Sequence, residues 1–449
     1  MKVAKFGGTS LASADQIKKV CAIVTSDPDR RLVVVSAPGK RFKEDTKVTD
    51  MLIACAKAGL QKGNADAELQ AVIARFADIA SELGVDGGIV RTIADDLTAR
   101  VNADKTNSGR YTDSLKAAGE DNCAKLVAAY LQNTGVEARY VSPKDAGLLL
   151  SDEFGNAQVL PESYDNMKYL ADLPGITIFP GFFGYSSSGE VVTLPRGGSD
   201  ITGSIVAAAV NADLYENFTD VDNVYSVNPN LIKSPRPIHE LTYREMRELS
   251  YAGFSVFHEE ALVPVFHKGV PVRIKNTNNP AAPGTTIVKE RSGITDPVIG
   301  IACDTGFCFI YLSKYLMNRE VGFGRKLLQI LEEEHIPFEH IPSGIDNMSI
   351  ILKQHHLDEH KEKRILARIK DELAVDDISI DKNLALVMIV GEGMRHTLGI
   401  TARAATTLAK AGINLEMINQ GPSEVSMMFG VQAGDSDKAV IALYEEFFK

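Results

Sequence analysis

Two short stretches of the sequence combine a cation with a pair of glycines, which is what binding a phosphate group requires. The first is KFGGTS (5–10), where Lys5, Gly7 and Gly8 close a short apolar run and the hydroxyl of Ser10 follows. Glycines allow backbone N–H groups to approach phosphate oxygens, and a lysine supplies positive charge beside them. The alternative for this stretch alone is a glycine turn with an exposed lysine.

The second stretch is TLPRGGSDITGSIVAAAV (193–210), in which a glycine turn leads into a helix of small residues. Arg196 beside a glycine turn suits bidentate capture of a carboxylate. Ser199 or Asp200 could instead serve only as the N-cap of the helix. Two glycine-rich helix entries in one sheet, each with a cation, favour a shared binding site over two unrelated turns.

A third stretch, ENFTDVDNVYSVNPN (216–230), places acidic residues and a tyrosine after a predicted strand. Asp220 and Asp222 follow the strand, and Tyr225 is placed for contact with a ring or a ribose. By composition alone, the stretch is a turn.

Other motifs are better explained as ordinary structure. No GxxxxGK[ST] phosphate loop is present, and HEEAL (258–262) lacks the second histidine of a zinc protease motif. GEGMRHTLG (391–399) is read as a turn between a strand and a helix. His356 and His360 have a metal-compatible spacing, but they lie in a polar linker helix and are read as solvated surface.

Composition narrows the class of protein. A net charge of −11 argues against a general nucleic-acid binder but allows a local basic pocket. The five cysteines form no CxxC pair and lie in apolar surroundings, which indicates buried free thiols in a reducing cytoplasm. No signal peptide and no apolar run of about 18 residues is evident, so a membrane partner is not expected.

The elements that must position these residues alternate along the first part of the chain. Predicted strands and helices follow one another, which favours an α/β fold with a mainly parallel sheet and helices on both faces. In such sheets, ligands bind at the carboxyl ends of the strands. Residues 61–115 read as a helical insertion. The predicted strands are 3–6, 32–37, 138–142, 176–182 and 212–220, and the helices are 14–26, 48–59 and 121–133.

A Pro- and Gly-rich stretch, PAAPGTTIVKERSG (280–293), reads as a domain boundary. Beyond it, element order predicts two copies of a small βαββαβ unit, separated by the polar segment HHLDEHKEK. VIGIACD and FCFIYLS are expected to be separate strands. The expected domains are therefore 1–290, 295–380 and 381–449.

Four stretches together, KFGGTS, TLPRGGSD, FTDVDNVYSVNP and PVRIKNTNNPAAPGT, resemble the aspartokinases, and the likeness covers nearly the whole chain. The resemblance implies an amino acid kinase fold followed by two ferredoxin-like ACT domains. It implies ATP-dependent phosphorylation of the β-carboxylate of L-aspartate to 4-phospho-L-aspartate, the first step of lysine, threonine and methionine biosynthesis. ATP with Mg²⁺ is the implied cofactor, and no protein residue is assigned as a metal ligand.

The resemblance also assigns roles to matching positions. Lys5 neutralises the phosphoryl group in transfer and Asp200 holds the lysine, so these two are the expected catalytic residues. Arg196 grips the α-carboxylate of aspartate, and Glu120 receives its amino group. The implied ATP-binding residues are Lys5, Gly7, Gly8, Ser10, Thr219, Asp220 and Tyr225. The implied aspartate-binding residues are Ser36, Thr49, Glu120, Arg196, Gly197 and Ser199.

The sequence departs from the family's common pattern at a few positions. Pro195 stands where glycine is common, Asn230 where an arginine is frequent, and Ser255 where some members have a nucleotide-contacting lysine. Lys275 is a possible substitute for that lysine.

In the ACT region, the resemblance implies a site for a feedback amino acid, with lysine as first choice and threonine or a combination next. The alternative is that the ACT units serve only as a dimer interface. A homodimer or a dimer of dimers through these units is expected. The implied effector residues are Met317, Glu320, Gly322, Phe323, Gly324, Phe338, Glu339, Ser343 and Asp346, with Asn347 beside them.

Two other functions stay open at this point. Arg196 and Glu120 suit a different acyl-phosphate-forming amino acid kinase, such as one acting on glutamate. A non-catalytic amino-acid sensor would keep the fold without the chemistry, although retention of Lys5 and Asp200 argues against it.

Overall fold

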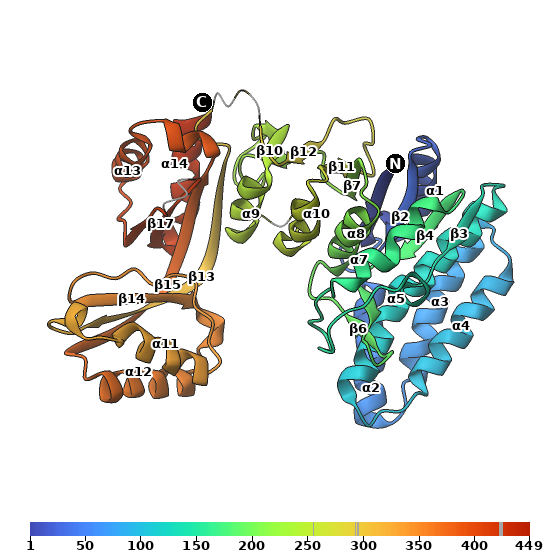
Figure 1. Cartoon of the computed structure of the whole chain (residues 1–449), viewed down its shortest axis with the longest axis horizontal. Coiled ribbons are helices and arrows are strands. Elements are labelled where there is room, and N and C mark those ends of the chain that lie inside the picture. The colour runs from blue at the N-terminus through green and yellow to red at the C-terminus, as the bar shows by residue number, and fades with distance from the viewer. Residues whose placement is uncertain (255, 292, 294–295, 422–424) are drawn as a thin grey trace. The chain divides into compact units, whose positions relative to one another are not determined.

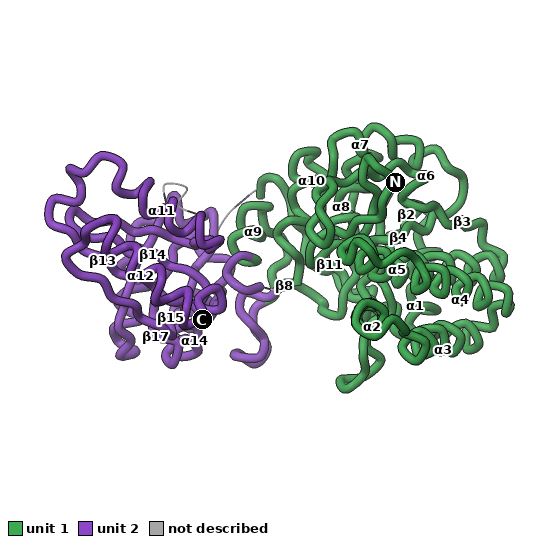
Figure 2. Tube along the Cα trace, turned by 90° about the horizontal axis from the view of Figure 1, so that it is seen from below, with its two compact units in different colours: residues 1–224, 237–250, 255–292 green, residues 225–236, 251–254, 293–449 purple. Residues whose placement is uncertain are grey.

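The computed structural model describes residues 1–254, 256–291, 293, 296–421 and 425–449, and these form two compact units (Figure 2). The first unit comprises residues 1–224, 237–250 and 255–292, and the second comprises 225–236, 251–254 and 293–449. The chain therefore passes between units more often than one boundary at 280–293 implies. Val227 explains part of this, because it is 1% exposed within a core of the second unit. The domain bounds given above stay a prediction.

The first unit is built on an eight-stranded sheet in the order β10-β12-β11-β7-β1-β2-β4-β3 (Figure 1). The six strands from β11 to β3 run parallel, which confirms the predicted mainly parallel sheet. β12 runs antiparallel to β11. The strands are β1 (Lys2–Phe6), β2 (Arg30–Val35), β3 (Ala138–Tyr140), β4 (Ile176–Pro180), β7 (Leu214–Thr219), β10 (Glu240–Thr242), β11 (Val272–Asn276) and β12 (Thr285–Val288). Short two-stranded sheets pair β5 (Phe183–Tyr185) with β6 (Val191–Thr193), and β8 (Val224–Tyr225) with β9 (Pro237–Ile238).

Helices cover both faces of this sheet. The main helices are α1 (Ala14–Thr25), α2 (Val48–Lys62), α3 (Asp66–Leu83), α4 (Gly87–Val101), α5 (Ser108–Asn133) and α8 (Gly198–Ala209). Shorter ones are α6 (Pro143–Ala146), α7 (Glu162–Asn166), α9 (Tyr243–Tyr251) and α10 (Leu262–Lys268). The expected helical insertion is present as α3 and α4. The helix expected over 121–133 is longer in the structure, because α5 begins at Ser108, where the Asn107 side chain accepts a hydrogen bond from Arg110 N.

Successive side chains of β1 point to opposite faces of the sheet, so apolar residues face the core and Lys5 faces the candidate site. Ala4 and Phe6 are fully buried in the core that β1 and β2 share with α1 to α5. Lys5, one residue out of phase, points to the opposite face, which α8 covers. The strand therefore delivers one charged side chain to the α8 side while its neighbours anchor the sheet.

The second unit has one five-stranded antiparallel sheet in the order β14-β13-β15-β17-β16, with helices packed in two pairs (Figure 1). Its strands are β13 (Gly300–Ser313), β14 (Asn347–Lys353), β15 (Asp377–Val390), β16 (Met417–Asn419) and β17 (Ser426–Gln432). Its helices are α11 (Phe323–Glu333), α12 (Glu359–Leu373), α13 (Ile400–Lys410) and α14 (Ser436–Phe448). Two cores lie on this sheet, one against α11 and α12, the other against α13 and α14.

Two details of the second unit differ from the expectation. The two strands expected in 298–313 are one strand, β13, whose register shifts between Asp304 and Phe307. The polar segment HHLDEHKEK is not only a linker, because Asp358 caps α12 and the helix begins inside it. His356 and His360 fall in different elements, and the described residues hold no cluster of three or more potential metal ligands.

All five cysteines are free thiols, and four of them are buried, which confirms the expected buried free thiols except at Cys303. Among the described residues, no helix has the length and apolar character needed to cross a bilayer.

Candidate active site

The expected site residues gather at the carboxyl edge of the sheet, where β11, β7, β1, β2 and β4 end next to one another. Backbone hydrogen bonds continue past the strands. Gly7 N donates to Phe218 O at 3.2 Å, and Ser36 N donates to Phe6 O at 3.2 Å. This edge is where open α/β sheets bind ligands.

An ion pair between a buried lysine and a partly buried aspartate lies at this edge. Lys5 Nζ is 2.5 Å from Asp200 Oδ1, and Lys5 is only 6% exposed. Asn217, on the neighbouring strand β7, donates to the same oxygen at 2.7 Å. Asp200 lies in the first turn of α8, so the pair joins β1 to the start of that helix. Asp200 therefore holds Lys5, and the Asn217 amide holds Asp200.

The backbone beside Lys5 is packed too closely for side chains. Gly39 N donates to Gly8 O at 2.8 Å, and a Cβ added at Gly39 would lie 2.6 Å from Gly8 C. A Cβ on Gly8 would lie 3.0 Å from the Ala37 carbonyl oxygen. The two glycine-bearing loops after β1 and β2 therefore touch through their backbones. Gly39 was not among the expected site residues.

The turn before α8 also depends on glycine. Gly197 is the N-cap residue, with φ +82° and no capping side chain, so the reading of Ser199 or Asp200 as the N-cap is wrong. A Cβ on Gly197 would lie 2.7 Å from His258 Cβ, and a Cβ on Gly181 would lie 2.8 Å from Ser199 Cβ. His258 was not recognised from the sequence, although HEEAL was noted.

Glu120 contributes a buried carboxyl group from α5. It is 5% exposed, and burial raises its pKa to about 8, against the opposing effects of a backbone hydrogen bond at Ala37 and the charges of Lys116 and Lys5. Its Oε2 atom has no hydrogen-bond partner among the described residues. A buried, unsatisfied carboxyl oxygen is the kind of group that an ammonium ligand would satisfy.

Two expected aspartate-binding residues lie close to these loops, and a third is exposed. Ser36 directly follows β2, and Thr49 is the second residue of α2. Arg196 is exposed in the turn that precedes α8.

The expected ATP-binding residues are only partly brought together. Thr219 ends β7 at the same edge, and Asp220 directly follows it and is exposed. The Ser10 hydroxyl is 2.7 Å from that of Thr277, so it already joins two loops. Tyr225 belongs to the second unit, as does Asn230.

Lys275 is occupied by the protein itself. Its Nζ donates to the carbonyl oxygen of Ala282 at 2.6 Å, and burial lowers its pKa. Ser255 lies outside the described residues.

The expected effector residues all lie in the second unit, around the start of α11 and the strand β14. Glu320 accepts hydrogen bonds from Lys314 at 2.6 Å and from Lys326 at 2.9 Å, which lower its pKa to about 2. Asp346 accepts from Leu316 N at 2.8 Å. These acidic groups therefore shape the loop itself.

The other effector residues divide between core and surface. Met317 and Phe323 are buried, and Gly322 is the N-cap of α11 with φ +83°, two residues before Gly324. Phe338 is half exposed, and Glu339 accepts a hydrogen bond from the Tyr251 hydroxyl. Ser343 lines a cavity of about 330 Å³. The other lining residues are Phe309, Pro342, Gly344, Asn347, Ser349, Ile351, Leu384, Glu416, Met417 and Ile418.

Comparisons with known proteins agree with this architecture. The amino acid kinase family model matches residues 1–276, and an ACT domain model matches residues 387–447. Aspartokinase 3 of Bacillus subtilis is 60% identical, over 100% of this chain and 99% of that protein. Lysine-sensitive aspartokinase 3 of Escherichia coli is 26% identical over 100% of this chain and 99% of that one. The crystal structure of Clostridium acetobutylicum aspartate kinase has a TM-score of 0.88 and 38% identity, and it covers 100% of both chains. The chain thus belongs to the amino acid kinase family and, within it, to the aspartokinases.

Proposed function

We propose that the chain transfers the γ-phosphoryl group of ATP to the β-carboxylate of L-aspartate, forming 4-phospho-L-aspartate. The observation that carries this proposal is the ion pair of the buried Lys5 with Asp200 beside the touching backbones of Gly8 and Gly39. It supplies a fixed positive charge next to N–H-bearing loops, which is the arrangement that phosphoryl transfer needs.

The reaction does not need a strong general base, because the β-carboxylate that attacks the phosphorus is already anionic at neutral pH. The difficulty is bringing one anion to another. Lys5 reduces that repulsion, and its fixed position keeps the cost of reorganisation low. Asp200 holds the ammonium group in place at 2.5 Å.

The donor set also fits a nucleotide-bound Mg²⁺. Both hydrogen-bonded contacts to the Asp200 carboxylate involve Oδ1, and no cluster of three or more potential ligands exists among the described residues. With the nucleotide bound, its phosphates and the Asp200 carboxylate would hold the metal. When bound, Mg²⁺ offsets phosphate charge.

Aspartate would be held at both ends. Arg196 is exposed and available to pair with the α-carboxylate, and Glu120 offers a buried carboxyl oxygen to the amino group. An ammonium ion next to Glu120 would favour its ionised form, so substrate binding and ionisation support each other.

The decisive experiment measures ADP release from Mg-ATP with L-aspartate, and with L-glutamate as the matched control. Hydroxylamine trapping of the acyl phosphate identifies the product. Aspartate-dependent ADP and hydroxamate are expected, with at least a tenfold preference over glutamate. Equal rates with glutamate would favour the wider class of amino acid kinases, and no amino-acid-dependent ADP would favour a sensor.

We also propose feedback inhibition by lysine at the second unit, and assembly as a homodimer or dimer of dimers. The support is the ACT match at residues 387–447 and the name of the lysine-sensitive relative in Escherichia coli. Lysine and threonine, alone and together, should be compared in the ADP assay, and light scattering should give the molar mass. A monomer at assay concentration would contradict the assembly. A location in the cytoplasm stays a prediction.

A further inference from the structure

A buried arginine outside the expected site holds the loop that touches the phosphate glycines. Arg75 on α3 is 4% exposed, an unusual burial for an arginine. Its Nη1 is 2.9 Å from Asp45 Oδ2, and its Nη2 donates to the carbonyl oxygen of Gly39 at 2.8 Å. One guanidinium group therefore fixes both ends of the segment from residue 39 to residue 45.

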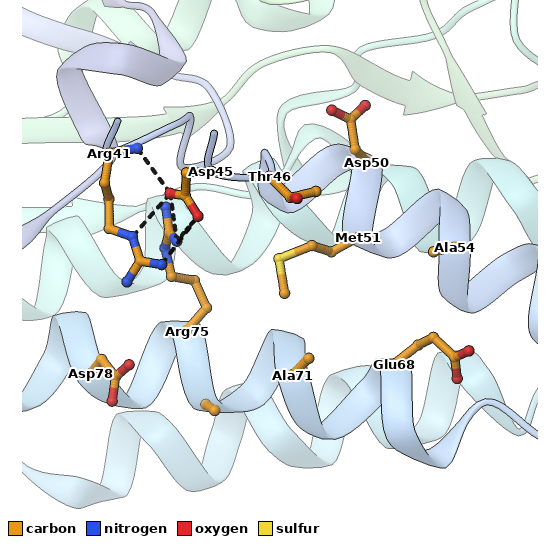
Figure 3. A pocket seen from close by; sticks show the side chains of 11 residues that line it. Arg41, Asp45, Thr46, Asp50, Met51, Ala54, Glu68, Ala71, Arg75 and Asp78 are labelled. Carbon is orange, nitrogen blue, oxygen red and sulfur yellow. Dashed lines mark hydrogen bonds and ion pairs between the residues drawn. The ribbon is translucent and has the colours of Figure 1, made fainter. Parts of the chain in front are cut away.

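A second arginine completes this arrangement, and both converge on the Asp45 carboxylate (Figure 3). Arg41 approaches Asp45 Oδ2 with both its Nε and its backbone N at 2.9 Å. These bonds hold the pKa of Asp45 well below its usual range. We call Arg41, Asp45 and Arg75 the arginine clamp.

The clamp lies one contact away from the phosphate site. Gly39, whose carbonyl Arg75 binds, donates its N–H to Gly8 O at 2.8 Å. Because a Cβ on Gly39 would lie 2.6 Å from Gly8 C, the two backbones have little freedom to move independently. The same segment leads into α2, where Thr49 is the second residue. Displacing the segment would therefore disturb both the nucleotide side and the aspartate side of the site.

Few apolar contacts hold residues 39–45 on the side where the arginine clamp lies. A cavity of about 390 Å³ lies between α2 and α3, and the clamp residues form part of its wall (Figure 3). Phe42, the large apolar residue of the segment, is 58% exposed. The cavity is lined by Arg41, Asp45, Thr46, Asp50, Met51, Ala54, Glu68, Ala71, Ala74, Arg75 and Asp78. The polar bonds of the clamp therefore restrain the segment on the side of this cavity.

We propose that Arg75 is a positioning residue for the kinase reaction proposed above, on which this role depends. Through the Gly39 carbonyl it sets the backbone of Gly8 for phosphate binding, and through Asp45 it fixes the approach to Thr49. A lysine could keep one of these bonds but not both, because it lacks the planar fork of arginine.

The test compares Arg75→Met with Arg100→Met. Arg100 on α4 is a matched control: it bonds Asp96 at 3.0 Å, Asp121 at 2.7 Å and the Ser114 carbonyl at 2.9 Å, all within helices. Both variants should lose stability in urea unfolding. Only Arg75→Met should raise the KM for ATP, by about tenfold or more, with a smaller fall in kcat. Equal KM values in the two variants would overturn the proposal.

Two further variants cover the case in which Arg75→Met does not fold. Arg75→Lys should show the same KM effect in a milder form. Arg75→Ala opens onto the cavity, so millimolar ethylguanidinium should enter and restore the KM towards the wild-type value. No effect of Arg75→Lys on KM, or no rescue of a folded Arg75→Ala, would count against the role.

The affinity for Mg-ATP tests the role of Arg75 separately from the proposed kinase reaction. Calorimetric titration of Mg-ATP without aspartate should show weaker binding to Arg75→Met than to Arg100→Met. If the wild type released no aspartate-dependent ADP, the proposed reaction would fail, while this titration would still decide whether Arg75 positions the nucleotide loop.

Discussion

At the scale of single residues, the candidate site contains two buried ionisable groups in different surroundings. Lys5 is buried and paired with its counter-ion, Asp200, so its charge is compensated. Glu120 is buried with an oxygen that has no partner among the described residues, so its charge is penalised. Lys5 is therefore suited to bind an anion, and Glu120 is suited to bind a cation.

Replacing Lys5 tests the first group. Lys5→Met should lower kcat by roughly 100-fold or more, because it removes a charge preorganised for the transition state. Lys2→Met is the matched control: Lys2 lies on the same strand and pairs with Asp27 at 2.6 Å at the opposite edge. Steady-state ADP release and circular dichroism check both. Near-normal turnover of a folded Lys5→Met would refute the assignment.

Glu120 predicts a pH dependence with a defined sign. Because burial raises its pKa to about 8, the folded protein keeps this proton at pH values where the unfolded chain, near its ordinary 4.5, has lost it. Stability therefore falls as pH rises from about 4.5 to about 8, and the Glu120→Gln variant should lack that part of the decline. Urea unfolding at several pH values measures it.

Ionisation of Glu120 should also make aspartate binding depend on pH. In the proposed binding mode, the ammonium group of aspartate pairs with the ionised form of Glu120, so kcat/KM for aspartate should rise with pH towards 8 in the wild type. The rise should be weaker in Glu120→Gln. Parallel profiles for the two proteins would remove Glu120 from the aspartate site.

At the scale of elements, local patterns predicted the strands and helices better than the contacts between them. The sequence predicted that Lys5 and Asp200 belong to one site because each lies at a glycine-rich helix entry that a few residues define, and the structure places them in contact. Gly39, Arg75 and His258 were not predicted, since their contacts join segments far apart in the sequence. The Asn217 amide could have been noticed as a polar residue within the apolar strand LYENFT.

The turn before α8 gives the prediction at this scale. Gly197→Ala places a side chain at φ +82° and 2.7 Å from His258 Cβ. Gly189→Ala is the matched control, with φ +85° and no described atom within 4 Å of the added Cβ. The left-handed conformation costs each about 1 kcal/mol, but only Gly197→Ala also displaces the turn that carries Arg196. Gly197→Ala should therefore be the less stable variant.

The KM for aspartate distinguishes displacement of the turn before α8 from backbone strain alone. Gly197→Ala should raise the KM for aspartate several-fold, because Arg196 immediately precedes the strained residue, whereas Gly189→Ala should not. A KM unchanged in both variants would mean that Arg196 does not contact aspartate.

At the scale of the whole molecule, the second unit is one sheet carrying two cores. β13 contributes Ile301 to one core and Ile310 to the other, and β15 likewise runs through both halves. The order of elements predicted the repeated units, but it did not predict that β13 and β15 run through both of them. Where a strand continues past a register shift depends on its hydrogen bonds to neighbouring strands, which the local sequence does not show. A change in one half therefore has a direct structural route to the other.

The two halves offer a matched test of the proposed lysine response. Gly322 starts α11 with φ +83°, and Gly399 starts α13 with φ +84°. A Cβ at either glycine would meet no described atom within 4 Å, so alanine should cost each helix start a similar amount, about 1 kcal/mol. Only Gly322 lies among the proposed effector residues. Gly322→Ala should therefore raise the lysine concentration for half-inhibition about tenfold, while Gly399→Ala should leave it within about twofold.

Basal activity must be recorded for both variants, because a coupling free energy is defined only relative to the uninhibited enzyme. Unchanged basal kcat with lost inhibition in Gly322→Ala places the effector at the start of α11. Equal losses in both variants would mean that the shared sheet transmits strain from either half, which would move the regulatory role from one loop to the whole second unit. Inhibition lost only in Gly399→Ala would assign the effector site to the other half of the sheet.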